Sequence, residues 1–142
     1  MNGPPPKAQS PKQQAAGRRA RFPQAARLLR HADFERVYER GRRHFARHMT
    51  FFFLSGGSEA RVGFTVGRAV GGAVQRNRIK RRLREAVRRE RQRLDLAVDV
   101  VINPKRSVLQ ASFAEITQDV SRAFEIIQGK LRTTGTGANI SQ

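Results

Sequence analysis

The residues best suited to chemistry in this sequence are cations gathered between Gln75 and Leu94. This stretch reads QRNRIKRRLREAVRRERQRL and holds ten Lys and Arg residues against Glu85 and Glu90. Guanidinium groups bind phosphate through paired hydrogen bonds and stack on bases, so a dense run of Arg is suited to a nucleic acid. A face that neutralises many phosphates gives binding that weakens steeply with salt and depends little on base sequence.

The same stretch is predicted to be an amphipathic helix. At about 100° per residue, its apolar residues fall within roughly a third of the circumference and are expected to pack on a sheet. They are Ile79, Leu83, Ala86, Val87 and Leu94. The other faces are almost wholly cationic, and repulsion between like charges four residues apart, as at Lys80 and Arg84, suggests that a bound polyanion compensates it. A charge run is more often a solvated face, but solvated helices normally mix both signs. Asn77 interrupts the Arg pattern, as an N-cap or as a polar group presented to RNA.

The whole chain has the same bias. It has 142 residues and a net charge of +18, and 24 of its 29 cationic residues are Arg, which indicates a polyanionic partner. The absence of cysteine excludes a disulfide scaffold, a thiolate metal site and a Cys nucleophile, and makes the reducing cytoplasm the expected compartment. No long apolar run and no secretory signal are visible, so no membrane partner is expected.

Aromatic residues form a second candidate site. Phe34 and Tyr38 fall at helical spacing before Gly41, which is expected to be a left-handed C-terminal cap. In the predicted strand around Thr50–Leu54, alternation places Phe52 on one face and its two Phe neighbours on the other. Core packing would explain any one of these rings, but two aromatic faces leave one available for a ligand or for another layer.

A self-sufficient nuclease would need a general base or clustered carboxylates that bind a metal. The candidates are His31, His44, His48, Asp95 and Asp99. His44 and His48 lie four residues apart in a predicted strand, at a separation too long for joint metal ligation without a bend. The two Asp residues flank a helix-to-strand junction, where a solubilising or turn role is the simpler interpretation.

These residues must be positioned by a small α+β domain. Residues 1–26 are rich in Pro, Gln and Arg and contain no acid, which predicts a disordered basic arm. The folded RNA-binding domain is expected over residues 27–130, with a flexible tail over 131–142. Its predicted elements begin with a helix over 32–40, two or three strands over 44–54 and 61–66, and the basic helix from 73 to about 94. A central strand over 97–102, buried on both faces, follows. The last helix begins with a Ser112/Glu115 capping box and ends by Gly129.

The stretch Arg61–Glu85, RVGFTVGRAVGGAVQRNRIKRRLRE, resembles the signature of the bacterial ribonuclease P protein subunit. Members of that family carry an R-(V/I)-G-hydrophobic-(S/T)-V strand, a Gly-containing turn and R-N-R-x-K-R-x-x-R-E. Three further features agree in order: Asp33-Phe34 at the start of an aromatic helix, the aromatic strand, and Val98–Asn103 followed by Pro104. The resemblance covers about 100 residues, from Leu28 to Ile127.

The resemblance implies a protein cofactor that binds a large catalytic RNA and promotes removal of the 5′ leader from precursor tRNA. Phosphodiester hydrolysis would then belong to the RNA and its Mg²⁺ ions, and no catalytic side chain or metal ligand is assigned to this chain. The protein would act as a monomer in a 1:1 ribonucleoprotein. The residues that inherit contact with the catalytic RNA are Arg76, Asn77, Arg78, Lys80, Arg81, Arg84 and Arg88. Those that inherit contact with the leader are Phe34, Tyr38, Phe52, Thr65 and Arg68. The implied fold is a small two-layer sandwich like the ribosomal protein S5 domain 2, in the order α-β-β-β-α-β-α, with a rare left-handed crossover.

The sequence departs from the family pattern after the first conserved strand. The family usually has a Ser-Lys-Lys-like segment and then Gly-Asn-Ala, whereas this chain has Gly67-Arg68-Ala69 and Gly71-Gly72-Ala73. Arg68 preserves one charge, but a second cation and an Asn are missing at Ala69 and Gly72. Leader or metal contacts that depend on those two residues are therefore not expected here.

A non-enzymatic ribosomal or ribosome-assembly protein is the alternative, because composition and the basic helix fit it equally well. The long signature and the aromatic helix-plus-strand pair favour the ribonuclease P interpretation, since a purely structural binder needs no stacking cleft. A DNA-binding protein is disfavoured because no helix-turn-helix, zinc or coiled-coil pattern is present.

Overall fold

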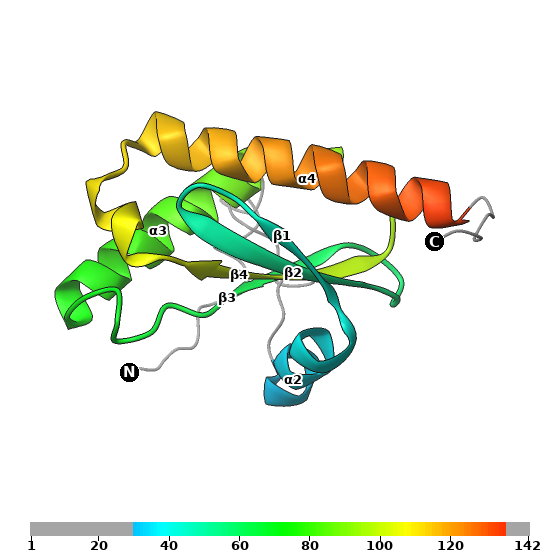
Figure 1. Ribbon diagram of the computed structural model, residues 1–142, viewed down its shortest axis with the longest axis horizontal. Coiled ribbons are helices and arrows are strands. Elements are labelled where there is room, and N and C mark those ends of the chain that lie inside the picture. Colours follow the sequence, from blue (N-terminus) through cyan, green and yellow to red (C-terminus); the bar gives the residue numbers. More distant parts are fainter. Residues whose placement is uncertain (1–29, 136–142) are drawn as a thin grey trace, which may run out of the picture.

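The computed structural model describes residues 30–135 of the chain (Figure 1). It confirms the α+β class and the expected order of elements, with two short 3₁₀ helices added. The predicted arm, residues 1–26, and the end of the predicted tail, residues 136–142, lie outside the described residues. The elements are α2 (His31–Arg40), β1 (Arg42–Phe45), β2 (Met49–Ser55), β3 (Arg61–Phe64), α3 (Ala73–Glu90), η2 (Arg91–Arg93), β4 (Val98–Pro104), η3 (Arg106–Gln110) and α4 (Phe113–Gly135).

The four strands form one sheet in the order β1-β2-β4-β3. β2 pairs antiparallel with both β1 and β4, whereas β3 and β4 are parallel neighbours. A parallel pair needs a crossover connection, and α3 provides it. β4 is central, and its residues Val98, Val100, Val101 and Ile102 are fully buried, as its continuous apolar run predicted.

The two faces of the sheet are covered unequally. α3 and α4 lie together on one face, and the shorter α2 lies on the other (Figure 1). The main core is on the α3–α4 side, where Phe51 and Phe53 of β2 are fully buried with Leu83 and Phe124. A smaller core is on the α2 side, where Val37 and Val101 are fully buried. The sheet with α3 and α4 on one face is the predicted sandwich, and α2, the predicted helix over 32–40, covers the other face and positions the aromatic residues.

Gly41 ends α2 as predicted, but its predicted left-handed conformation is wrong. Its φ of −80° and ψ of 169° are extended values that any residue adopts. The need for glycine is instead steric, because a Cβ atom at this position would lie 2.4 Å from the carbonyl oxygen of Val37 and 2.8 Å from that of Phe53. Gly41 therefore allows the end of α2 to approach the backbone of β2 closely.

The predicted end of the last helix is also wrong, because α4 continues through Gly129 to Gly135. A glycine inside a helix costs about 1 kcal/mol relative to alanine. Tertiary contacts beyond it offset this cost: Leu131 packs on the main core, and Arg132 Nη2 donates to Asp95 Oδ1 at 3.0 Å. Residues 131–135 are therefore helical, although they were predicted to belong to the flexible tail.

Two predicted strands differ in their limits. The stretch 44–54 is a hairpin of β1 and β2 with a turn at Ala46–His48, and β3 ends at Phe64. The capping box of α4 is confirmed, because Glu115 Oε1 accepts from the Ser112 amide at 2.9 Å and the Glu115 amide donates to Ser112 Oγ at 3.1 Å. The backbone hydrogen bond from Ser112 is the main cause that lowers the pKa of Glu115.

Candidate nucleic-acid interface

The cationic surface of α3 faces away from the sheet. Ile79, Leu83 and Val87 are buried against the main core, so the residues between them are left on the outside. We call this surface the α3 outer face. Asn77, Arg78 and Arg81 are exposed, and the remaining members of the face are half-buried. It consists of Arg76, Asn77, Arg78, Lys80, Arg81, Arg84 and Arg88, the residues that the resemblance assigns to the catalytic RNA.

Acid partners are few along this helix. Glu85 accepts from Arg88 Nη2 at 2.5 Å and from Arg89 Nε at 3.0 Å, and these bonds, the first above all, lower the pKa of Glu85 to about 2. Glu90 pairs with Arg93 at 2.6 Å. Of the predicted RNA-binding residues, Arg88 is therefore the one already neutralised by an acid.

The other cations of the α3 outer face are unpaired. Arg78, Lys80, Arg81 and Arg84 form no ion pair with any acid in residues 30–135. Like charges without a counter-ion repel one another, so this surface is electrostatically prepared for a polyanion. The prediction from the sequence, a helix with one apolar stripe and a cationic remainder, is confirmed.

The start of α3 settles the role of Asn77 in the helix. α3 begins at Ala73, and the amide of Gly72 donates to Gln75 Oε1 at 2.9 Å. Arg76 Nη1 donates to the carbonyl oxygen of Gly71 at 2.8 Å, so part of its guanidinium serves the turn before the helix. Asn77 lies inside the helix with an exposed side chain, and its interpretation as an N-cap is wrong.

The second candidate surface is the α2 side of the sheet. The rings of Tyr38 and Phe52 meet edge-to-face, with centroids 4.9 Å apart and an interplanar angle of 88°. Both rings are half-buried, as is Phe34, and all three pack around Val37 and Val101. The structure therefore brings together the three predicted leader-binding aromatics, which share a small core but keep part of each ring in solvent.

Polar groups border these rings. The Tyr38 hydroxyl is hydrogen-bonded to Thr65 Oγ1 and to Asn103 Oδ1, both at 2.9 Å. Thr65 thus lies beside Tyr38 as the prediction requires, whereas Arg68 lies exposed in the turn that follows β3 and touches neither ring. Sequence reasoning missed Asn103, although its position near the end of a central strand, one residue before Pro104, was a signal that its side chain lies where the sheet ends.

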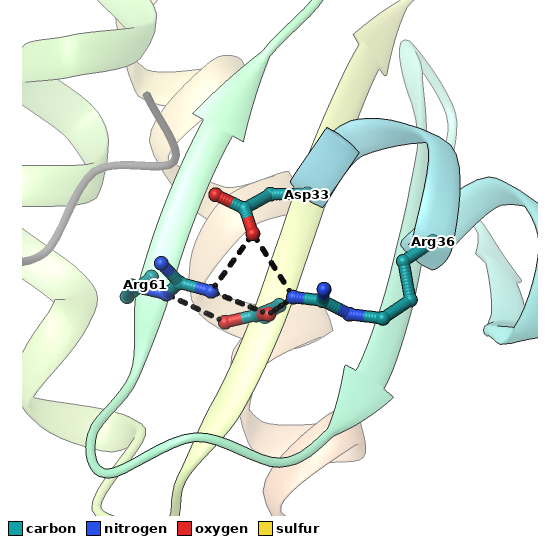
Figure 2. A network of polar contacts seen from close by, with 4 residues as sticks. Asp33, Arg36 and Arg61 are labelled. Carbon is teal, nitrogen blue, oxygen red and sulfur yellow. Dashed lines mark hydrogen bonds and ion pairs between the residues drawn. The ribbon is translucent and has the colours of Figure 1, made fainter. Parts of the chain in front are cut away.

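A half-buried ion-pair network fixes α2 on the sheet (Figure 2). Arg61 of β3 binds Asp99 of β4 through two parallel hydrogen bonds, from Nε and Nη2, each 2.9 Å long. Asp33 of α2 accepts from Arg36 at 3.0 Å and from Arg61 at 3.4 Å, and Arg36 also reaches Asp99 at 3.4 Å. The bond to Asp99 is the main cause that raises the pKa of Arg61. We call these four residues the α2 ion-pair network.

The network corrects the interpretation of Asp99, one of the two Asp residues near the helix-to-strand junction. Asp99 is 3% exposed and is not a solubilising or turn residue. Asp95 is exposed, but it accepts hydrogen bonds from Gln128 and Arg132 and so ties α4 to the segment before β4. Neither carboxylate is free to act as a general base.

The His residues do not form a nuclease site either. His44 lies in β1 and His48 in the following turn, so the prediction that one strand holds both is wrong. Both line one cavity of about 430 Å³ with Glu115 and Asp119. The His48 amide donates to Asp119 Oδ2, and His48 Nδ1 contacts Ser107 Oγ, each at 2.9 Å. Within residues 30–135, no group of three or more His, Asp or Glu residues is placed to hold a metal ion.

A small α+β protein with an unpaired cationic helix and a separate aromatic sheet face belongs to the class that binds single-stranded or structured RNA. Residues 22–128 match the family model described as Ribonuclease P, and the chain belongs to that family. Two curated relatives are both named ribonuclease P protein component. The one from Desulfovibrio desulfuricans is 41% identical over 98 residues, which cover 67% of this chain and 75% of the relative. The one from a Geobacter species is 39% identical over 112 residues, which cover 78% of this chain and 92% of the relative.

Solved structures agree with this assignment. The ribonuclease P protein of Staphylococcus aureus superimposes with a TM-score of 0.66 at 25% identity and covers 74% of this chain and 97% of its own. The protein from Thermotoga maritima shares the fold with a TM-score of 0.65 at 24% identity, over 70% of this chain and 96% of its own. No helix in the described part of the chain is long and apolar enough to cross a membrane.

Proposed function

We propose that this protein, as the protein subunit of ribonuclease P, binds the catalytic RNA through the α3 outer face and the 5′ leader of precursor tRNA on the α2 side of the sheet. It acts as one copy per RNA in the cytoplasm and promotes endonucleolytic maturation of the tRNA 5′ end. The observation that carries this proposal is the separation of an unpaired cationic helix from an aromatic face on opposite sides of one sheet. The alternative, a ribosomal or ribosome-assembly protein, is not favoured by the family match.

The α3 outer face suits a folded RNA. Its unpaired cations lie along one rigid helix, so they meet phosphates at fixed spacings and contribute a salt-dependent affinity that does not read sequence. Asn77 adds an exposed amide between Arg76 and Arg78. This surface therefore suits a partner that is recognised by its shape, such as a large structured RNA.

The α2 side suits a single strand. Unstacked bases gain about 1–3 kcal/mol each on an aromatic platform, and Tyr38 and Phe52 offer partly exposed rings at right angles. Thr65 and Asn103 supply polar atoms beside the rings, and Arg68 supplies a cation for phosphate at the β3 end. A precursor differs from mature tRNA by such a single strand, so this face distinguishes substrate from product.

The chain itself contributes binding and positioning, and hydrolysis is assigned to the RNA. Mg²⁺ is proposed to be bound mainly by that RNA, because the described residues present no set of carboxylates or imidazoles that fits a metal ion. Two carboxylates on the α2 side of the sheet, Asp33 and Asp99, are already engaged by Arg36 and Arg61. Neutralisation of RNA charge by the α3 outer face would let Mg²⁺ and substrate gather at moderate ionic strength.

Cleavage of a precursor tRNA at low Mg²⁺ tests the proposal. Three reactions are compared: a bacterial ribonuclease P RNA with the protein, the same RNA without it, and the protein without any RNA. Stimulation of the RNA together with no cleavage by the protein alone is expected. Binding to the RNA without stimulation would instead support the ribosomal alternative, and cleavage by the protein alone would show a nuclease.

The leader assignment has its own test. The double variant Phe34→Ala, Tyr38→Ala is expected to weaken binding of leader-bearing precursor much more than binding of mature tRNA. Tyr38→Phe, which keeps the ring but removes both hydroxyl contacts, separates stacking from the polar bonds and is expected to retain most of the affinity. Equal losses for precursor and mature tRNA would overturn the assignment of the leader to this face.

A further inference from the structure

The edge strand β1 continues the α2 side of the sheet beyond α2 itself. Arg43 pairs opposite Phe52, and Phe45 pairs opposite Thr50, so the register places both on the sheet face on which α2 packs. Phe45, at the end of β1, also lines the rim of the cavity that His44 and His48 share with α4. α2 packs over β2 and β4. Phe45 is 64% exposed, and Arg43 is exposed as well. In the described part of the chain, this face of β1 is therefore open.

The register aligns β1 with the polar border of the aromatic face. Phe45 is opposite Thr50, and Thr50 is opposite Asn103 on β4. The Thr65 amide bonds the carbonyl oxygen of Ile102, which continues the β3–β4 ladder and places Thr65 beside Asn103. One row of side chains thus crosses all four strands, from Thr65 on the β3 side to Phe45 at the β1 edge.

We propose that Phe45 and Arg43 form an additional single-strand subsite at the β1 edge, which binds a leader nucleotide further from the cleavage site than those on Tyr38 and Phe52. This proposal rests on the proposed function and extends it. The direction follows from connectivity: α3, the helix proposed to dock on the catalytic RNA, follows β3 through a short loop, and β1 is the opposite edge of the sheet. A strand that crosses the sheet from the docking side therefore leaves over β1.

The two side chains have the chemistry that single strands require. Phe45 offers a ring to one base, and diagonal cross-strand neighbours such as Phe45 and Phe52 are about 7–8 Å apart, close enough for adjacent bases of one extended strand. The Arg43 guanidinium lies over the Phe52 ring, 5.5 Å from its centroid, and forms no ion pair within residues 30–135. It is thus held at the Phe52 ring, on the same face of β1 as Phe45, and is available to bind the phosphate that joins their nucleotides.

The same strand supplies a matched control. Arg42 is the neighbour of Arg43 and lies over the Phe53 ring, also 5.5 Å from its centroid, and it is also exposed. Phe53 belongs to the main core, so Arg42 is on the opposite face of the sheet. The two arginines match in exposure, strand and ring contact, and differ in the face that they occupy.

The experiment measures binding of precursor tRNA by the reconstituted ribonucleoprotein, with a leader of about three nucleotides and one of about ten. Phe45→Ala is expected to weaken binding of the long-leader substrate by about fivefold and to leave the short-leader substrate unchanged. Phe45→Tyr should restore the wild-type affinity, whereas Phe45→Leu, which is apolar but has no π-face, should not. Arg43→Gln should lower the salt slope for the long leader by about 0.7, and Arg42→Gln should leave it unchanged.

Three results would overturn the subsite. One is an unchanged affinity of Phe45→Ala for the long leader while Phe52→Ala still weakens binding of precursor more than binding of mature tRNA, in which case the proposed function stands. Another is equal loss for both leaders. The third is a concentration-dependent dimer in sedimentation that Phe45→Ala abolishes, which would assign the β1 edge to a second copy of the chain. A wild-type protein indifferent to any leader would contradict the proposed function itself.

Discussion

Two arginine-rich regions of this protein use their charges in opposite ways. In the α2 ion-pair network, Arg36 and Arg61 each contact both Asp33 and Asp99, so two cations meet two anions. On the α3 outer face, five of six cations meet no acid within residues 30–135. The comparison shows that arginine content alone does not tell whether the charges stabilise the fold or are left available, whereas the presence or absence of acid partners does.

The difference follows from burial. Asp99 is almost completely removed from solvent, and a buried charge is tolerated only when it is paired and hydrogen-bonded. The cations of α3 reach water at their tips, so repulsion among them is a modest penalty that an RNA can reverse. Pairing in the α2 ion-pair network fixes the position of α2, and the absence of pairing on α3 keeps donors available for phosphate.

The largest effect is expected from breaking the network. Asp99→Ala removes the shared acceptor of Arg61 and Arg36 and leaves Arg61 partly buried without its bidentate partner. Because both guanidinium groups keep some water, the expected loss of unfolding free energy is about 2–3 kcal/mol, below the full cost of a buried unpaired ion. Urea denaturation measures it through a lower midpoint with an unchanged slope.

Asp95→Ala is the matched control for that experiment. Asp95 also contacts an arginine, Arg132, but the side chains are 65% and 59% exposed, so a much smaller loss is expected. Similar losses for Asp95→Ala and Asp99→Ala would show that burial does not distinguish the network from an ordinary surface pair.

The next effect concerns the unpaired cations. The double variant Arg78→Ala, Arg81→Ala is expected to weaken catalytic-RNA binding about tenfold or more and to reduce its salt slope by about 2, with stability unchanged. Arg93→Ala, which removes an arginine already paired with Glu90, should change the slope much less. An unchanged slope for the double variant would contradict the assignment of the α3 outer face as the docking surface.

The sequence alone was sufficient to predict which side of α3 is buried and which face of the sheet holds Phe52. The 3.6-residue spacing of Ile79, Leu83 and Val87 predicted which side of α3 is buried, and strand alternation separated Phe52 from its neighbours. Both predictions depend on local periodicity, which a single sequence displays. The assignment of named residues to RNA contacts came from the family resemblance and stays a prediction.

What the sequence could not predict depends on pairing between distant segments. Asp99 was interpreted as a turn residue because its partners, Arg61 and Arg36, are 38 and 63 positions away in the chain. Gly129 predicts a helix end, but the contacts that carry α4 past it come from elsewhere in the fold. The proposed role of Arg43 could not be predicted, because nothing local shows which face of an edge strand adjoins an aromatic site.

A smaller effect, tighter rather than weaker RNA binding, tests the comparison between paired and unpaired arginines within α3. Glu85→Gln removes the acid that Arg88 and Arg89 contact, which converts two paired arginines into unpaired ones. Catalytic-RNA binding is expected to tighten about two- to threefold, with a steeper salt slope, because each freed cation is able to contact a phosphate. Filter binding across a salt series measures both. Weaker binding of the variant would mean that Glu85 orients these arginines for RNA rather than withdrawing them from it.

The smallest expected effect concerns the protonated form of His44, which the fold disfavours. His44 lies on the sheet face opposite α2. Burial, and then the charge of Lys130, lower the pKa of His44 below its ordinary value of 6.5, against a weaker opposing effect of Asp119. The unfolded chain therefore binds this proton more tightly than the folded one, so stability is full above about pH 6.5 and falls as the pH drops through that value toward the folded pKa. The difference between the denaturation midpoint above about pH 6.5 and the midpoint below the folded pKa should be smaller in His44→Gln than in the wild type. Lys130→Gln should give an intermediate pH dependence, because it removes one cause and leaves burial in place. A pH dependence that His44→Gln leaves intact would assign the proton to another group.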